Sequence, residues 1–284
     1  MFVGQAGCLE RLACHTTVRG YTSAFCEQKK CDRVRSGNRW KRRATVRTQL
    51  VNLRAAAEVK TVLVVGASRG LGKQLVDVLA PKFTVHAVAR SPCGCENEHQ
   101  IDAREPESVK RLLKEIQPDA VINCVASAGL GEDFPMYAAT SQLVDACSEM
   151  SEKPLFLLVS ALGAGDSENS IPMQVKDNMR AMLLDKSRAE KYLRTQYSNF
   201  VIPRPVPLVD DAPSGCGAVT ESLNAYGAMT RTDLAVLIGE VIVSDKVSNK
   251  VLTAVDTTRL LHTSPYIRNY EFWESLPFEV YALN

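Results

Sequence analysis

A glycine-rich stretch, GASRGLG at residues 66–72, has the residue types and the spacing of a turn that binds phosphate. It follows the apolar run TVLVV and precedes a stretch of helical periodicity, so it lies where a strand would lead into a helix. At such a junction the backbone N–H groups and the positive end of the helix dipole point toward an anion. Gly66 would allow the tight turn, Gly70 a close approach of the backbone to phosphate, and Gly72 close packing of the helix on the strand. The alternative is a turn that is merely tight. The residues expected to bind a dinucleotide here are Gly66, Ala67, Ser68, Arg69, Gly70, Leu71 and Gly72.

The end of the second predicted strand indicates which dinucleotide is preferred. NAD-binding folds place an acid about 20 residues after the glycine turn to bind the ribose 2′-hydroxyl. Here the sequence is AVARSP, with Arg90 and no acid nearby. Arg90 and Arg69 could both bind a 2′-phosphate through planar guanidinium groups, so the sequence predicts NADP(H), with solvated surface arginines as the alternative. In NCVASAG the small turn around Val125 and Ala126 would let the backbone approach the cofactor's second ribose.

Short apolar runs alternate with helical stretches from residue 60 onward. The runs are continuously apolar, which indicates strands buried on both faces of a sheet. The expected strands are residues 61–65, 83–89, 120–126, 154–160, 199–204 and 250–255. The expected helices are residues 70–79, 106–116, 137–150, 175–197 and 232–244. Strands separated by helices indicate right-handed parallel crossovers, so we expect an α/β fold: a doubly wound, Rossmann-like parallel sheet in a single domain over residues 59–284.

Several motifs, taken in order, resemble the NmrA-like branch of the atypical short-chain dehydrogenase/reductase superfamily. They are TVLVVGASRGLG, AVAR, AVINCVA, LVSALGAG, KSRAEKYLR, NFVIPRPVPL and MTRTDLAVLI, which span about residues 60–255. The resemblance implies a Rossmann-like domain that binds NAD(P)H. It also implies that Asp102 lies near the adenine, with a capping or loop aspartate as the alternative. Arg204 and Pro205 would lie where the backbone of this family passes the nicotinamide amide.

The catalytic unit of this superfamily is incomplete in the sequence. In its Tyr-dependent members, a serine after the fourth strand and a Tyr-x-x-x-Lys motif on the next helix form an acid–base unit. Ser160 and Lys186 stand at the corresponding positions, but Met182 stands where the tyrosine would be. Because a thioether cannot transfer a proton, the usual alcohol–ketone chemistry is not expected. Ser160 and Lys186 remain the candidate catalytic residues and candidate contacts to the cofactor.

Three functions fit the loss of the tyrosine. The favoured one is an atypical reductase that passes hydride from NADPH to a small conjugated acceptor such as a flavin, a quinone or a tetrapyrrole. The acceptor would take its proton from solvent or from another residue. Asp166, Asp185, Tyr192 or a tyrosine near the C-terminus are the candidate residues, although none has the expected spacing. The second function is a non-catalytic sensor of NADP(H) that binds an organelle protein partner, and the third is an assembly or structural subunit of an organelle complex. The charged face of the helix that contains Lys186 is expected to be solvated, and it comprises Asp185, Arg188, Glu190, Lys191 and Arg194.

The N-terminal region differs in composition from the rest of the chain. Residues 1–60 contain 13 Lys and Arg against 4 Asp and Glu, whereas the remaining residues contain 21 against 28. A segment rich in Arg, Ser, Thr and Ala and poor in acids is typical of an organelle transit peptide. We therefore expect residues 1–58 to be a disordered transit peptide, and LRAAAEV favours a chloroplast over a mitochondrion. A nucleic-acid-binding tail at WKRRATVR is the alternative, but nucleic acid is not the expected partner.

Other features give weaker signals. No apolar run approaches the roughly 18 residues that a membrane-spanning helix needs, and the oligomeric state stays open. Cys93 and Cys95 with His99 are too few for a structural zinc site, so no metal is expected. Thiol oxidation next to the adenosine phosphate is one hypothesis for this loop, and a loop without a specific role is favoured. The aromatic-rich region of about residues 256–284 is expected to contact the substrate or a partner.

Overall fold

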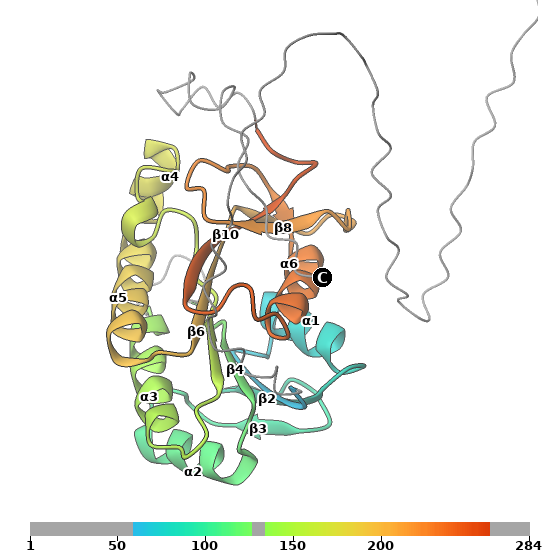
Figure 1. Ribbon diagram of the computed structural model, residues 1–284, viewed down its shortest axis with the longest axis vertical. Helices are drawn as coiled ribbons and strands as arrows, with labels where there is room; N and C mark the ends of the chain where they lie inside the picture. Colours follow the sequence, from blue (N-terminus) through green and yellow to red (C-terminus); the bar gives the residue numbers. More distant parts are fainter. Residues whose placement is uncertain (1–58, 127–133, 262–284) are drawn as a thin grey trace, which may run out of the picture. The chain divides into compact units, whose positions relative to one another are not determined.

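The structure is a computed structural model that describes residues 59–126 and 134–261 (Figure 1). Both ranges belong to the same compact unit. The transit peptide expected at residues 1–58 and the aromatic residues after Leu261 lie outside the described residues, and both stay predictions. The same holds for residues 127–133, which include the end of the small turn expected after the strand at residues 120–126.

An eight-stranded sheet forms the centre of the described residues, with strand order β3-β2-β1-β4-β5-β6-β10-β8. The strands are β1 (Thr61–Val65), β2 (Thr84–Ala89), β3 (Glu98–Gln100), β4 (Ala120–Asn123), β5 (Leu155–Leu158), β6 (Phe200–Pro205), β8 (Gly217–Thr220) and β10 (Lys250–Asp256). All neighbours pair in parallel except β8, which is antiparallel to β10 at one edge. A separate parallel pair is formed by β7 (Leu208–Val209) and β9 (Met229–Thr230).

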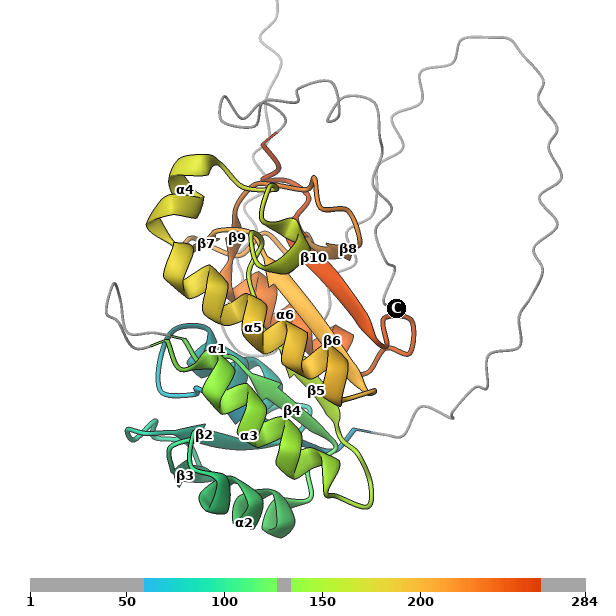
Figure 2. The ribbon, with the colours of Figure 1, turned by 90° about the vertical axis from the view of Figure 1, so that its left-hand side faces the viewer.

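Helices cover both faces of the sheet (Figures 1 and 2). They are α1 (Gly70–Leu79), α2 (Pro106–Ile116), α3 (Met136–Ser148), the 3-10 turn η1 (Gly165–Ser167), α4 (Met173–Asn178), α5 (Arg180–Gln196) and α6 (Arg231–Val241). Helices α2, α3 and α5 lie on one face, and α1 and α6 lie on the other. None of these helices is long and apolar enough to cross a membrane.

The central strands are apolar throughout because each of their faces contributes to a separate core. In β1, Val62 and Val64 belong to the cluster on the side of α1 and α6, whereas Leu63 and Val65 belong to the cluster on the side of α2, α3 and α5. Alternate side chains of a strand point to opposite faces, so a strand buried on both faces needs apolar residues at every position. The doubly wound, Rossmann-like fold expected from the sequence is confirmed.

The structure differs from the expected elements at one helix and at two short edge strands. The helix expected at residues 175–197 is divided into α4 and α5 at Met179, whose φ of −107° and ψ of 8° are not helical. Strand β3 was not expected because its three residues, EHQ, are all polar, and it pairs at the edge with β2. Strand β8 was not expected either, because it is a four-residue edge strand whose pairing with β10 is set by tertiary structure.

Candidate functional site

The glycine turn between β1 and α1 has the backbone geometry that the sequence predicts. Gly66 has a φ of +94°, in the region that favours glycine. A Cβ on Gly72 would lie 2.0 Å from the carbonyl oxygen of Gly66, so helix and strand can meet this closely only without a side chain. A Cβ on Gly70 would meet nothing within 4 Å. The first turn of α1 contains no acid, and its N-cap side chain makes no capping bond, which leaves this end of the helix suited to an anion.

A cavity of about 1020 Å³ opens beside this turn, at the carboxyl ends of the parallel strands. This is the edge at which open α/β sheets bind their ligands. The structure brings most of the predicted site residues together around it. Those that line it are Gly66, Ser68, Arg69, Gly70, Leu71, Gly72, Arg90, Asp102, Val125, Ala126, Ser160, Lys186 and Pro205. Ala67 is fully buried in the core and is not among the lining residues.

Three arginines line the end of the cavity beside β2. Arg69 and Arg90 were expected there, and the structure adds Arg104, which the sequence analysis missed. Arg104 binds Asp102, with Nη2 2.6 Å and Nε 3.1 Å from Oδ2, and this partner lowers the pKa of the Asp102 carboxyl. The charge of Asp102 is therefore largely compensated, and this end of the cavity is cationic overall. The DARE sequence, with Arg104 two residues after Asp102, was the signal that could have identified it.

The other end of the cavity contains a buried hydroxyl without a partner. Ser160 is 2% exposed, lines the cavity, and its Oγ makes no hydrogen bond to any described group. Buried polar groups are normally paired, so an orphaned one calls for an explanation. A ligand that supplies the missing partner gives one, because it would satisfy the hydroxyl on binding.

Lys186 lies beside Ser160 and is almost fully enclosed. Its Nζ donates to the backbone oxygens of Val159, at 3.2 Å, and Ser160, at 3.1 Å, and lies 3.7 Å from the sulfur of Met136. Burial lowers the pKa of Lys186 from 10.5 to about 8, although Glu190 and Asp185 oppose this effect. A thioether is a weak acceptor, so the third N–H of the ammonium group is the one most easily redirected to a ligand.

We expect the replacement Ser160→Ala to leave the free energy of unfolding of the cofactor-free protein unchanged, or to raise it by about 1 kcal/mol, because the hydroxyl has no bond to lose. Ser167→Ala is the matched control. The buried Ser167 Oγ accepts from Gly163 N at 2.9 Å and donates to Ala164 O at 2.6 Å, so its loss should cost about 1 to 3 kcal/mol. Urea unfolding measures both, and equal losses would show that the Ser160 hydroxyl has a partner in the folded protein.

The expected alternatives to the missing tyrosine do not line the cavity. Asp166 binds Arg204, and the Tyr192 hydroxyl donates to Asp145 at 2.6 Å. Asp185 accepts the backbone N–H groups of Met136 and Tyr137 at the start of α3. All three side chains thus have structural partners, and the terminal tyrosines lie outside the described residues. Met182 does line the cavity, where the tyrosine was expected.

The side chain of Arg204 points away from the cavity. It is 1% exposed, and Arg204 is not among the residues that line the cavity. Its Nη2 lies 2.6 Å from Glu190 Oε2, its Nε 3.0 Å from Glu190 Oε1, and its Nη1 binds Asp166. A guanidinium group bound on both sides has a structural role, and the expected approach of the backbone at this residue to the nicotinamide stays a prediction. Pro205, the next residue, does line the cavity.

The charged face expected on the helix that contains Lys186, which is α5, is incomplete. Glu190 is 2% exposed because it binds Arg204 beneath η1, and Asp185 caps α3. Arg188 also contacts another element, since its guanidinium carbon lies 4.5 Å from the centre of the Tyr137 ring. Three of the five residues expected to be solvated thus contact groups from other elements.

The loop that contains Cys93 and Cys95 is bound by Glu98, the first residue of the strand that follows it, β3. Glu98 accepts the backbone N–H groups of Cys93, at 3.0 Å, and Gly94, at 2.7 Å. Burial, together with hydrogen bonds to Cys95 and Glu98, raises the pKa of the Cys93 thiol to about 12, which opposes the thiolate that oxidation requires. His99 instead contacts His86, with 2.9 Å between Nδ1 of His86 and Nε2 of His99. Among the described residues, no group of three His, Cys, Asp or Glu is placed to hold a metal ion.

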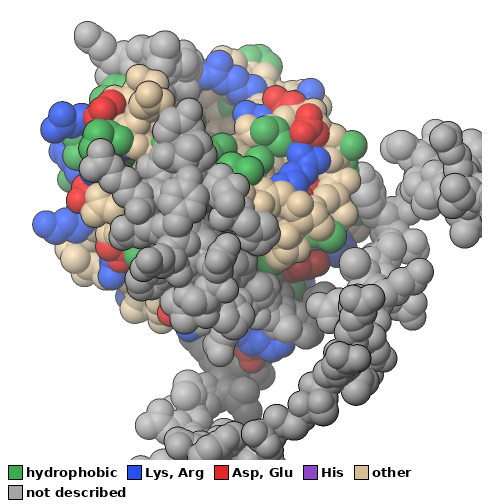
Figure 3. Space-filling model, turned by 90° about the horizontal axis from the view of Figure 1, so that it is seen from above, with side chains coloured by type: hydrophobic (Ala, Val, Ile, Leu, Met, Phe, Trp, Pro, Cys, Tyr) green, Lys and Arg blue, Asp and Glu red, His purple; other side chains and the backbone are tan. Residues whose placement is uncertain are grey.

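Charges of both signs share the surface at the end of the molecule where β8 lies (Figures 1 and 3). On the face in Figure 3, the visible Lys and Arg side chains are interspersed with Asp and Glu. The exposed ion pairs include Arg231 with Asp210 and Arg259 with Asp211.

The chain is similar to a known sequence family, to a plant protein and to solved structures. Residues 66–245 match the NAD(P)H-binding family. An uncharacterized chloroplastic protein of Arabidopsis thaliana is 26% identical over 219 residues, which cover 70% of this chain and 78% of that protein.

Two solved structures show the same fold. An anaerobilin reductase of Escherichia coli O157:H7 is 24% identical, with a TM-score of 0.61, over 70% of this chain and 98% of that one. A putative NADH-flavin reductase of Streptococcus pneumoniae is 16% identical, with a TM-score of 0.56, over 70% of this chain and 100% of that one. At these identities the likeness concerns the fold.

Proposed function

The chain belongs to the NAD(P)H-binding family, and from that premise we propose that it is an atypical short-chain reductase of the NmrA-like type, which uses NADPH to reduce a conjugated organic acceptor. One arrangement carries the proposal. The same cavity has a phosphate-binding turn and three arginines at one end, and a buried lysine and an orphaned serine hydroxyl at the other. The first end suits a dinucleotide, and the second suits proton transfer and binding of the acceptor.

The preference for NADPH over NADH rests on charge. Arg69, Arg90 and Arg104 line the adenosine end, and Asp102 is bound to Arg104. An acid that is already bound to a guanidinium group is a poor acceptor for a ribose 2′-hydroxyl, whereas arginines bind phosphate in a planar, two-point manner. These residues would therefore hold the 2′-phosphate of NADPH.

The proposed proton donor is Lys186. Of the titratable groups that line the cavity in the described residues, the arginines do not release protons near neutral pH, and Asp102 is bound to Arg104. Burial raises the pKa of the Cys124 thiol to about 12. The pKa of Lys186, about 8, is close to a physiological pH, where a general acid is most effective.

The proposed reaction balances with these residues. When bound, NADPH supplies a hydride, and so both electrons, to the conjugated acceptor. The reduced acceptor then takes one proton from the Lys186 ammonium group, and solvent returns that proton to the amine. The Ser160 hydroxyl would donate to an oxygen or nitrogen of the acceptor and so orient it. This route uses no tyrosine, which is consistent with Met182 at that position.

Binding and turnover on the full-length protein test the proposal. Calorimetry gives the affinities for NADPH and NADH, and the absorbance of NADPH reports its oxidation with flavins, quinones and linear tetrapyrroles. Turnover with any of these acceptors supports the reductase function. Tight NADPH binding without turnover on all of them would contradict it and would favour the NADP(H)-sensing or assembly function, in which the chain binds an organelle protein.

We expect Arg90→Asp to weaken NADPH binding by roughly tenfold or more while NADH binding changes little. The reason is that the replacement removes a charge-assisted bond to the 2′-phosphate worth about 1.5 to 3 kcal/mol. Arg111→Asp, on the exposed side of α2 and outside the cavity lining, is the matched control for the change in net charge. Calorimetric titration of both cofactors measures the ratio. Equal weakening of NADPH and NADH by Arg90→Asp would remove the basis for the preference.

A plastid location is part of the proposal. It is supported by the composition of residues 1–58 and by the chloroplastic relative in Arabidopsis thaliana. Import of the full-length precursor into isolated chloroplasts and mitochondria, followed by sequencing of the mature N-terminus, tests it. Import into mitochondria alone would contradict it.

A further inference from the structure

The acceptor end of the cavity combines an apolar wall with one arginine. The wall comes from the η1–α5 region, with Ile171, Val175 and Met179 beside Met182. Arg231, the first residue of α6, also lines the cavity. We infer that the acceptor carries a carboxylate or phosphate group and that Arg231 binds it; this inference rests on the proposed reductase function.

The sheet places Arg231 at the same end as Ser160 and Lys186. Leu162 N donates to Pro205 O at 3.0 Å, which joins the segment after β5 to the end of β6. The chain then continues into β7, which pairs with β9 immediately before Arg231. Arg90, in contrast, follows β2, and four strand spacings separate β2 from β6 in the sheet. At about 4.8 Å for each spacing, the ends of β2 and β6 lie roughly 19 Å apart, so Arg90 can serve the 2′-phosphate of the dinucleotide while Arg231 serves the acceptor. The start of α6 also lies beside α1, where Thr232 Oγ1 is 3.3 Å from Gln74 Oε1, and the affinity for NADPH is therefore measured below as a separate readout.

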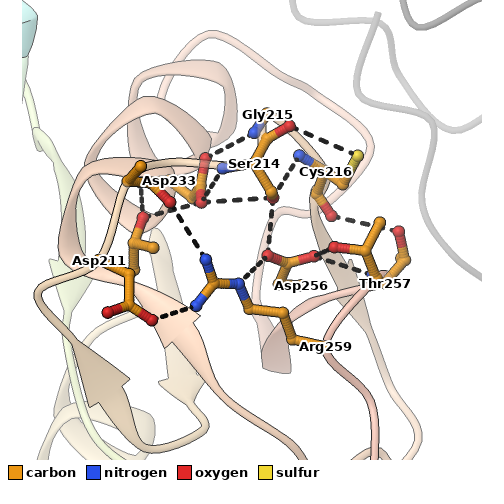
Figure 4. Close-up of polar contacts among 11 residues, drawn as sticks. Asp211, Ser214, Gly215, Cys216, Asp233, Asp256, Thr257 and Arg259 are labelled. Atoms are coloured by element: carbon orange, nitrogen blue, oxygen red, sulfur yellow. Dashed lines mark hydrogen bonds and ion pairs between the residues drawn. The ribbon is translucent and has the colours of Figure 1, made fainter.

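A polar network fixes the backbone at Arg231. Thr230 caps α6 by accepting from Asp233 N at 2.9 Å, and its hydroxyl donates to Asp233 Oδ2 at 2.7 Å. Asp233 also accepts the N–H groups of Ser214 and Gly215, each at 2.9 Å (Figure 4). The Ser214 hydroxyl donates in turn to Asp256, at 2.6 Å, on β10. The start of α6 is thus tied to the neighbouring loop and to the sheet, which limits the positions that the Arg231 side chain can reach.

The charges around Arg231 favour an anionic ligand. Its described partner is Asp210, whose side chain is 76% exposed. Such exposed pairs contribute little free energy, and a guanidinium group has five N–H donors, so a ligand anion can share Arg231 with Asp210 or displace it. The one carboxylate that lines the cavity in the described residues is Asp102, at the opposite end. An apolar wall with a cation and no nearby lining acid suits a flat, apolar molecule with an anionic substituent.

Two matched pairs of acceptors separate the anionic group from the conjugated ring. FMN and riboflavin share one ring system and differ in a phosphate, and biliverdin and its dimethyl ester differ in two carboxylates. With the full-length protein and saturating NADPH, we expect kcat/KM to be at least about tenfold higher for the charged member of a pair. Arg231→Gln should abolish that difference without changing the affinity for NADPH. Asp210→Asn, which leaves the arginine in place, should keep the difference or increase it.

Binding of the same four compounds to the complex with NADP⁺, followed by their absorbance or fluorescence, tests the inference independently of turnover. Tighter binding of the charged member that depends on Arg231 supports the inference even where no reduction occurs, in which case the reductase function alone fails. Equal binding of both members, binding of none, or a charge preference that persists in Arg231→Gln overturns it. Weaker NADPH binding by Arg231→Gln also overturns it, because Arg231 would then belong to the dinucleotide site.

Discussion

Replacing Glu190 with alanine should lower the free energy of unfolding by about 3 to 5 kcal/mol and leave the affinity for NADPH unchanged. Glu190 and Arg204 are 2% and 1% exposed and share two hydrogen bonds, of 2.6 and 3.0 Å. Removal of one member of a buried ion pair leaves the other charge in the interior without compensation, and such losses are typically this large. Urea unfolding gives the stability, and calorimetry below the unfolding transition gives the affinity.

The acid on the other side of Arg204 provides the control. Asp166 binds the same guanidinium group, but its side chain is 62% exposed, so Asp166→Ala should cost less than about 1 kcal/mol. Glu190→Gln, which keeps the shape of the side chain, covers the case in which Glu190→Ala does not fold. A small loss of stability for both Glu190 variants, together with weaker NADPH binding, would return Arg204 to the cofactor site.

Arg204 illustrates where the sequence stops being informative. Its partner, Glu190, precedes it by 14 residues on another element, and the two meet only because α5 packs beside β6. Packing against this ion pair also explains the glycine at position 165, because a Cβ there would lie 2.6 Å from Arg204 Nη2. Neither charge pattern nor spacing encodes such a contact, so the sequence could not show that the side chain of this arginine is bound away from the cavity.

The glycine turn was predictable for the opposite reason. Its requirements are local, since Gly66 and Gly72 lie six residues apart and contact each other directly. Likewise, strands buried on both faces show continuous apolar runs whatever their partners, which is why the sheet could be expected. Arg104 and Arg231 were missed because only the arrangement of the strands shows which of many arginines face one cavity.

Replacing Lys186 with methionine should raise the free energy of unfolding of the cofactor-free protein at pH 7 by about 1 to 2 kcal/mol while it removes most of the turnover. Burial lowers the pKa of Lys186 from 10.5 to about 8, and each pH unit of such a shift corresponds to about 1.4 kcal/mol. Charged Lys186 thus destabilises the fold by about 3 kcal/mol, and its two bonds to the oxygens of Val159 and Ser160 offset part of the gain from its removal. Urea unfolding and NADPH oxidation measure the two effects.

Titration of Lys186 should therefore move stability and turnover in opposite directions. Between pH 8 and 10.5 the unfolded chain holds the proton that the folded protein has lost, so the free energy of unfolding rises with pH in this window. Below pH 8 both states hold the proton, and Lys186 gives the free energy of unfolding no pH dependence. A general acid must be protonated, so kcat/KM should fall as the pH rises through about 8. Lys191→Met, at an exposed position on the same helix, should keep both dependences, and Lys186→Met should lose the rise in stability. If turnover instead falls as the pH drops below 8, or if Lys186→Met is as active as the unmodified protein, Lys186 is not the proton donor. Cofactor binding alone would then explain why the protein keeps a buried lysine that destabilises the fold.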